Sequence, residues 1–177
     1  MRRSRVFQLP NLLTIARLFL SPVFIAFFLV DAFWGAVCAL VVAVIFEITD
    51  LLDGFIARRY EMVSSLGKLI DPMADSIARF SVFLAFTTEP TIRDHPWPIL
   101  LAAVIFYRDA VVAYVRTFAA STGVVLAARP TGKIKAMFQG VGILTFLVFR
   151  VVSYQNPDLR GWVPVVFYSL MCPIVVV

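Results

Sequence analysis

The chain has 177 residues, of which 61% are hydrophobic and 15% are charged, and its formal net charge is +5. Soluble globular domains contain about 45–50% apolar residues, so this composition excludes an ordinary soluble domain. No dense basic run follows Arg2, Arg3 and Arg5. The positive charge therefore indicates membrane topology rather than a nucleic-acid-binding face, and we expect no nucleic-acid partner.

Six apolar stretches follow one another along the chain, separated by polar or Pro/Gly-containing turns. Each approaches the about 20 apolar residues that cross a bilayer, so each is predicted to be a membrane-spanning helix. The expected helices cover residues 11–30, 33–59, 67–88, 97–122, 132–152 and 161–177. A basic segment, residues 1–10, precedes them. The predicted fold class is an all-α integral membrane protein with six transmembrane helices in a single domain, residues 1–177.

The turns between these predicted helices alternate in charge. One side of the membrane would carry nine basic residues: Arg2, Arg3, Arg5, Arg58, Arg59, Lys68, Arg129, Lys133 and Lys135. The other side would carry three: Arg93, Arg150 and Arg160. Because short cytoplasmic segments are enriched in Lys and Arg, we expect a multi-pass protein of the cell (inner) membrane with both termini in the cytoplasm.

Four aspartates lie near the predicted cytoplasmic ends of the second and third helices. Asp50 and Asp53 are three residues apart, so they share a helix face. Asp71 and Asp75 are four apart and share a face of the next helix. With about 1.5 Å of rise per residue, both pairs reach a similar depth, roughly 5–12 Å inside the membrane edge. A short turn is expected to make these helices antiparallel neighbours, so the carboxylates predict a polar, metal-binding cavity open to the cytoplasm.

The carboxylates need a counter-charge, because each charged residue at a membrane centre costs about 2.5–3.5 kcal/mol on insertion scales. Carboxylate oxygens suit Mg²⁺, Mn²⁺ or Ca²⁺, and two such ions would neutralise a phosphoryl or diphosphate substrate. Two alternatives stay open: buried ion pairs with Arg17, Arg58 or Arg79, and a small divalent-cation transporter. Gly54 and Ala57 leave the helix without bulk beside the acids, which suits either a flat ligand or close helix packing.

The spacing Asp50-x-x-Asp53-Gly54-x-x-Ala57-Arg58, followed by Gly67-x-x-x-Asp71-x-x-x-Asp75, resembles the signature of the CDP-alcohol phosphotransferase family. The resemblance implies transfer of a substituted phosphate from a CDP-linked donor to an alcohol, with release of CMP, in a homodimer. It also implies two divalent ions, Mg²⁺ or Mn²⁺, as cofactors and Asp75 as the catalytic base. The implied metal ligands are Asp50, Asp53, Asp71 and Asp75. The implied donor contacts are Asp50, Asp53, Gly54, Ala57, Arg58 and Gly67.

Two further patterns resemble the phosphatidylglycerophosphate synthase branch of that family. They consist of Pro10, Asn11, Thr14 and Arg17 around the start of the first predicted helix, and of Arg108, Asp109, Arg116, Gly132, Lys133, Lys135 and Gln139. That branch usually has Glu where this chain has Asp109. The resemblance implies CDP-diacylglycerol as the donor and glycerol 3-phosphate as the acceptor. The residues expected to bind the acceptor phosphate are Thr14, Arg17, Arg108, Arg116, Lys133 and Lys135.

The positive charge on these helices independently favours an acceptor that carries a phosphate, since a neutral alcohol requires less. Inositol phosphate would meet the same requirement, and serine is a further alternative acceptor for the same reaction type. Arg108 and Arg116 could instead form a structural ion pair with Asp109 or Glu47. The two lysines could reflect positive-inside topology alone.

Overall fold

The structure, a computed structural model, describes residues 9–59, 65–122 and 130–176. Side chains at several helix ends fall outside this description, among them those of residues 53–59, 65–72 and 130–134. The helices are α1 (Leu9–Leu29), α2 (Phe33–Arg59), α3 (Ser65–Phe86), α4 (Trp97–Ser121), α5 (Pro130–Gln155) and α6 (Val163–Val176), with a short 3₁₀ helix, η2 (Pro157–Trp162), before α6. This order confirms the all-α prediction, and no helix end differs from its expected position by more than three residues.

Three of the helices are long and apolar enough to cross a membrane, as judged over the described residues. These segments are Phe33–Leu52 in α2, Trp97–Val115 in α4 and Lys135–Gln155 in α5. In α1 the apolar part is shorter, Thr14–Leu29. The 14 residues of α6 would extend only about 21 Å at the rise of an α-helix, because η2 occupies the residues before it. The structure is therefore that of a helical membrane protein. Its clearest membrane-spanning helices are α2, α4 and α5.

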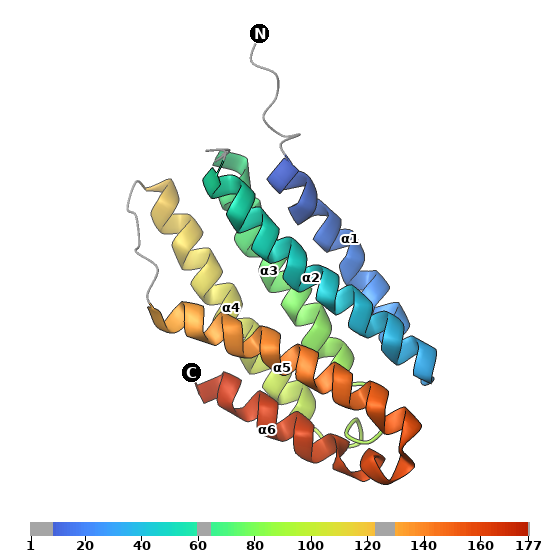
Figure 1. Ribbon diagram of the computed structural model, residues 1–177. Helices are drawn as coiled ribbons and strands as arrows, with labels where there is room; N and C mark the ends of the chain where they lie inside the picture. Colours follow the sequence, from blue (N-terminus) through green and yellow to red (C-terminus); the bar gives the residue numbers. More distant parts are fainter. Residues whose placement is uncertain (1–8, 60–64, 123–129, 177) are drawn as a thin grey trace.

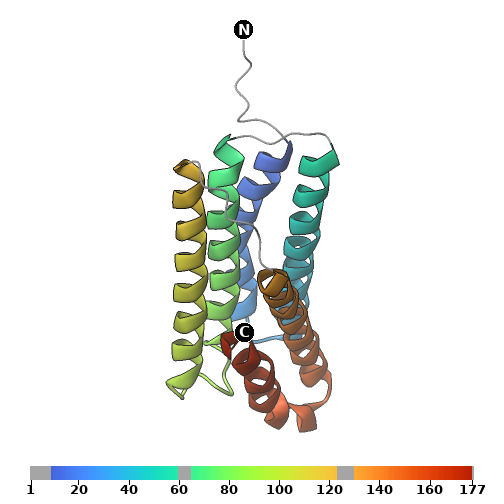
Figure 2. The same ribbon diagram turned by 90° about the vertical axis from the view of Figure 1, so that its left-hand side faces the viewer.

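The helix α1 lies between α2 and α3 and packs against both (Figure 2). In the described part of the chain, α2 and α3 make at most weak contact with each other, so the expected direct pairing of these two helices is wrong. The reason is that α1 lies between the two helices and packs on both of them. On the other side of the molecule α5 crosses obliquely and packs on α2, while α6 packs on α5 and α4 (Figure 1). Helices α2 and α3 thus both pack on α1, and α5 packs on α2.

A row of phenylalanine rings joins four helices in the apolar core. The ring centroids of Phe28 and Phe86 are 5.4 Å apart, those of Phe86 and Phe146 4.5 Å, and those of Phe146 and Phe167 5.7 Å. These separations fall in the range in which aromatic pairs contribute beyond simple burial. The row therefore packs α1, α3, α5 and α6 against one another.

A buried ion pair lies beside this row, at the end of the bundle where α3 leads into α4. Arg150 Nε on α5 is 2.7 Å from Glu89 Oε2, and the two side chains are 2% and 3% exposed. Arg150 Nη2 also donates a hydrogen bond of 3.1 Å to the carbonyl oxygen of Phe28. Its guanidinium carbon lies 3.9 Å from the centre of the Phe28 ring. One arginine therefore connects α5 to α1 and to the segment between α3 and α4.

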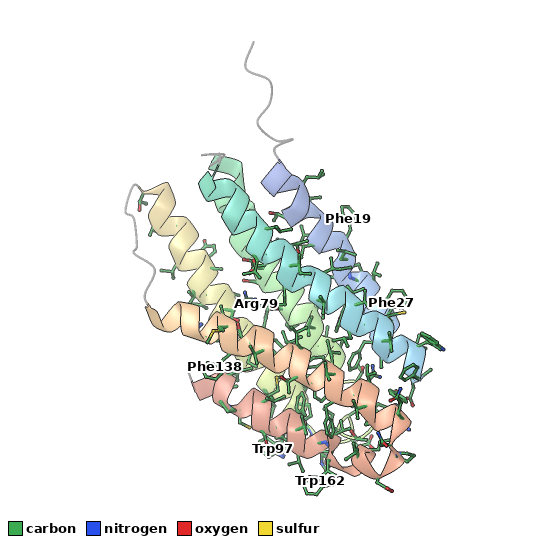
Figure 3. The ribbon with its side chains drawn as sticks, viewed as in Figure 1. Phe19, Phe27, Arg79, Trp97, Phe138 and Trp162 are labelled. Atoms are coloured by element: carbon green, nitrogen blue, oxygen red, sulfur yellow. The ribbon has the colours of Figure 1, made fainter. Side chains whose placement is uncertain are left out.

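Large apolar side chains cover the outside of the bundle. Phe19 and Phe27 project from the outer face of α1, and Phe138 projects from α5 (Figure 3). Trp34, Trp97 and Trp162, which are the three tryptophans of the chain, are all exposed. Trp34 is the second residue of α2, Trp97 begins α4 and Trp162 ends η2, and these helix ends lie at the same end of the bundle. Exposed tryptophans gathered at one level are typical of a membrane–water interface.

Candidate active site

Two of the four aspartates meet at one arginine. Arg17 Nη1 on α1 lies 3.2 Å from Asp50 Oδ1 on α2 and also contacts Asp75 Oδ1 on α3. The predicted convergence of carboxylates from the second and third helices is therefore observed for this pair. It takes place across α1, because α1 lies between the two helices and carries the arginine that both acids contact.

Arg17 and Thr14 were expected to bind the acceptor phosphate, and both are almost fully buried on the inner face of α1. They are three residues apart and so share that face. The structure places Arg17 with the aspartates, which agrees with the alternative of buried ion pairs. Arg79 also approaches this group, with Nη2 3.9 Å from Asp50 Oδ2. Two arginines therefore accompany the two described aspartates.

These residues line a small hollow of about 30 Å³ that is open at one side. Its lining residues are Arg17, Ala43, Phe46, Glu47, Asp50, Asp75, Ala78, Arg79, Val82 and Ile143. The wall thus combines charged groups from α1, α2 and α3 with small and apolar side chains. The charged side chains of three helices therefore face one another across this hollow.

Glu47 is a further acid of this hollow that the sequence motif does not contain. It lies three residues before Asp50 on α2. Because residues three apart share a helix face, this spacing could have predicted that Glu47 joins the site. A methyl group placed on Gly140 of α5 would lie 2.7 Å from Glu47 Oε2. A larger residue at position 140 would therefore collide with the Glu47 carboxylate.

The remaining metal and donor candidates lie outside the described side chains. They are Asp53, Gly54, Ala57, Arg58, Gly67 and Asp71. Among the side chains that are described, no three His, Cys, Asp or Glu residues are close enough together to hold a metal ion. The donor set nevertheless fits divalent cations, because oxygens of Asp50 and Asp75 already approach a single positively charged nitrogen of Arg17. Carboxylate oxygens are the ligands that Mg²⁺ and Mn²⁺ prefer.

A second polar group, centred on Asp109 of α4, lies between α4 and α5. Lys135 Nζ is 2.6 Å from Asp109 Oδ1, and Arg108 Nη1 is 3.2 Å from the same oxygen. Gln139 Nε2 donates a hydrogen bond of 3.0 Å to Asp109 Oδ2. Two of the cations expected to bind the acceptor phosphate are thus brought together, and each contacts Asp109. Of the other three expected cations, Arg17 lies with Asp50 and Asp75, and Arg116 and Lys133 have side chains outside the described part of the chain.

Gln139 connects this second group to the aspartates. Its Oε1 accepts a hydrogen bond of 2.8 Å from Arg79 Nη1, and Arg79 in turn approaches Asp50. Figure 3 shows Arg79 inside the bundle, near the crossing of α5. A continuous polar path therefore runs from Asp109 on α4 through α5 and α3 to α2. Gln139 and Asp109 appeared in the sequence only as parts of a pattern, and no spacing rule predicts that they meet Arg79.

The fold and this site define a helical membrane protein in which acidic residues of two helices gather around buried arginines. Residues 7–174 match the family model described as CDP-alcohol phosphatidyltransferase. The chain therefore belongs to the CDP-alcohol phosphatidyltransferase family, which confirms the resemblance of its aspartate motif and makes it a phosphatidyltransferase enzyme.

Named relatives agree with this assignment. The chain is 34% identical to a CDP-diacylglycerol–glycerol-3-phosphate 3-phosphatidyltransferase of Bacillus subtilis, over 92% of this chain and 90% of that protein. It is 31% identical to a protein of the same name from Pseudomonas fluorescens, over 88% of this chain and 77% of that protein. It is also 29% identical to a CMP-forming cardiolipin synthase of Oryza sativa, over 87% of this chain and 50% of that protein.

Proposed function

We propose that this enzyme transfers the phosphatidyl group of CDP-diacylglycerol to glycerol 3-phosphate, giving phosphatidylglycerophosphate and CMP. The observation that carries the proposal is the similarity to the Bacillus subtilis enzyme of that name, which extends over nearly the whole of both chains. The match of the family model over residues 7–174 supports a single domain spanning the chain. Family membership argues against the alternative of a divalent-cation transporter.

In the proposed reaction the acceptor hydroxyl oxygen attacks the β-phosphorus of the donor. The bond between that phosphorus and the bridging oxygen breaks, CMP leaves with the bonding electrons, and Asp75 takes the hydroxyl proton. Two divalent ions, Mg²⁺ or Mn²⁺, would be held by Asp50, Asp53, Asp71 and Asp75 and would neutralise the diphosphate and the leaving CMP. The donor would be bound by Asp50, Asp53, Gly54, Ala57, Arg58 and Gly67.

The acceptor phosphate would be bound by cations of α1, α4 and α5. The proposed residues are Thr14, Arg17, Arg108, Arg116, Lys133 and Lys135. The contacts of Arg108 and Lys135 with Asp109 support a preformed group of cations, which a phosphate binds more strongly than a neutral alcohol does. Inositol phosphate and serine are the alternative acceptors. The similarity to the cardiolipin synthase favours cardiolipin formation as a second candidate function.

The enzyme is further proposed to lie in the cell (inner) membrane as a multi-pass homodimer, with both termini and the active site facing the cytoplasm. The excess of basic residues on the side of the aspartates supports this orientation. A cysteine introduced at Ser64, which lies outside the described residues, should be protected from an impermeant thiol reagent in intact cells. Labelling from outside would reverse the proposed orientation.

The decisive experiment is an acceptor panel with purified enzyme, radiolabelled CDP-diacylglycerol and Mg²⁺. We expect CMP release and a phosphatidylglycerophosphate product with glycerol 3-phosphate, and much slower release with inositol phosphate, serine or glycerol. If the enzyme instead forms cardiolipin when membrane lipid is supplied, cardiolipin formation, the second candidate function, is identified. Preference for an acceptor without a phosphate would contradict the proposal.

A further inference from the structure

We propose that Asp109 and Gln139 are positioning residues that hold Arg79 beside Lys135, so that Arg79 contacts the phosphate of the acceptor. Arg79 would then be a specificity-determining residue for phosphorylated acceptors. This inference rests on the proposed function, because it assigns a role in acceptor binding. The observation behind it is the hydrogen-bonded path from Asp109 through Gln139 to Arg79.

Gln139 has the side chain that this path requires. Its neighbour Asp109 can only accept hydrogen bonds when ionised, and its neighbour Arg79 can only donate them. A carboxamide does both, so the NH₂ group must face Asp109 and the oxygen must face Arg79, as observed at 3.0 Å and 2.8 Å. Gln139 is 1% exposed. Its buried amide is therefore held in one orientation by its two partners.

Arg79 combines a fixed side with a side that faces the hollow. Nη1 is bound to Gln139, whereas Nη2 is 3.9 Å from Asp50 Oδ2, beyond the length of a good hydrogen bond. The side chain is 26% exposed and belongs to the wall of the hollow. The guanidinium can therefore meet an anion in the hollow without giving up Gln139. It lies in the interior, where α5 crosses the bundle (Figure 3).

The charges around Asp109 leave a positive surplus. Lys135 and Arg108 contact its carboxylate directly, and Arg79 is reached through Gln139. Two cations thus contact this one acid, while Arg79 also lies 3.9 Å from Asp50. Lys135 is nearly buried, with its side chain 4% exposed, so its charge is poorly screened by water. A phosphate would be attracted by this surplus charge, and an arginine fork is well suited to bind it.

The test is a double-mutant cycle on Arg79 and Gln139, using purified enzyme in detergent with CDP-diacylglycerol and Mg²⁺. We expect Arg79→Met to raise the KM for glycerol 3-phosphate by about tenfold or more, the effect of losing one charge-assisted hydrogen bond. Gln139→Met should raise it by a similar factor. Because Gln139 acts through Arg79, the double variant should be no more than about twofold worse than Arg79→Met alone. Gln155→Met, at the exposed end of the same helix, is the matched control and should change nothing.

Additional readouts separate positioning from a merely structural role. The KM for CDP-diacylglycerol and the Mg²⁺ concentration for half-maximal activity should stay within about twofold of wild type in both single variants. Asp109→Glu, which keeps the charge, should retain more acceptor affinity than Asp109→Asn. If a Met variant fails to fold, Gln139→Glu takes its place, because it keeps the acceptor for Arg79 while repelling Asp109.

Three outcomes would overturn the inference. If the double variant raises the KM for glycerol 3-phosphate by the product of the two single-variant factors, Gln139 does not act through Arg79. A changed Mg²⁺ requirement with an unchanged acceptor KM would make Arg79 a counter-ion of Asp50 only. A raised donor KM would place Arg79 on the donor side. If the wild type uses a different phosphorylated alcohol, the proposed function fails and the double-mutant cycle is run with that acceptor. If the wild type uses only an uncharged alcohol, the proposed function and this inference both fail.

Discussion

The buried pair of Glu89 and Arg150 provides the most direct test of what holds the bundle together. Replacing Glu89 with Gln removes the negative charge and leaves nearly the same shape. Arg150, which is 2% exposed, would keep its bond to the carbonyl oxygen of Phe28 and its position over that ring. Its charge would lose its counter-ion in an environment with little water. We therefore expect the variant to be strongly destabilised.

The magnitude follows from the burial of both partners. Breaking a buried ion pair by removing one partner costs about 3–5 kcal/mol, which for a chain of this size corresponds to a fall in Tm of roughly 6–20 °C. Burial raises the pKa of Glu89, although Arg150 opposes the shift. The attraction within the pair therefore does not fully offset the cost of desolvating the acid. The double variant Glu89→Gln/Arg150→Met, which removes both charges, should accordingly be more stable than Glu89→Gln alone.

Thermal unfolding in detergent micelles would measure these differences. The matched control is Asp94→Asn, because Asp94 lies in the same segment and its pair with Arg93 is 3.9 Å long and largely exposed. Exposed pairs contribute about 0–1 kcal/mol, so this variant should unfold close to wild type. The activity of folded Glu89→Gln enzyme at low temperature should be unchanged, since the pair does not line the hollow. A Glu89→Gln variant within about 1 kcal/mol of wild type would refute the argument.

Three further predictions concern the site and two glycines. Asp50→Asn should lower kcat at least about 10²-fold, and excess chelator should abolish wild-type activity; full turnover under either condition would contradict a metal-assisted reaction. Gly35→Ala should cost about 1–3 kcal/mol of unfolding free energy, because its new methyl carbon would lie 2.4 Å from a backbone oxygen. Gly161→Ala, which has open space, is the control and should leave the thermal unfolding unchanged. Gly140→Ala should displace the Glu47 carboxylate, which it would meet at 2.7 Å, and therefore reduce activity more than Tm; equal loss of both would show that the contact is purely structural.

The helices and the aspartate motif could be predicted from the sequence because both are local properties. The length of each apolar stretch sets the length of each helix, so the six helices were found with ends close to those observed. The spacing of Asp50 and Asp53 along one helix fixes a shared face whatever the helix packs against. The motif likewise identified the family, since its residues are read at fixed separations along one part of the chain.

The tertiary structure decided which helices meet, and with them the partners of each charge. The protein-facing and lipid-facing sides of a membrane helix are both largely apolar, so hydropathy does not tell one from the other. The sequence therefore predicted that α2 and α3 pair directly, whereas α1 lies between them and brings Arg17 to both aspartates. For the same reason Gln139, 60 residues from Arg79 and 30 from Asp109, became a bridge only when α5 crossed the bundle. Contacts over such separations depend on helix packing, which no local pattern in the chain encodes.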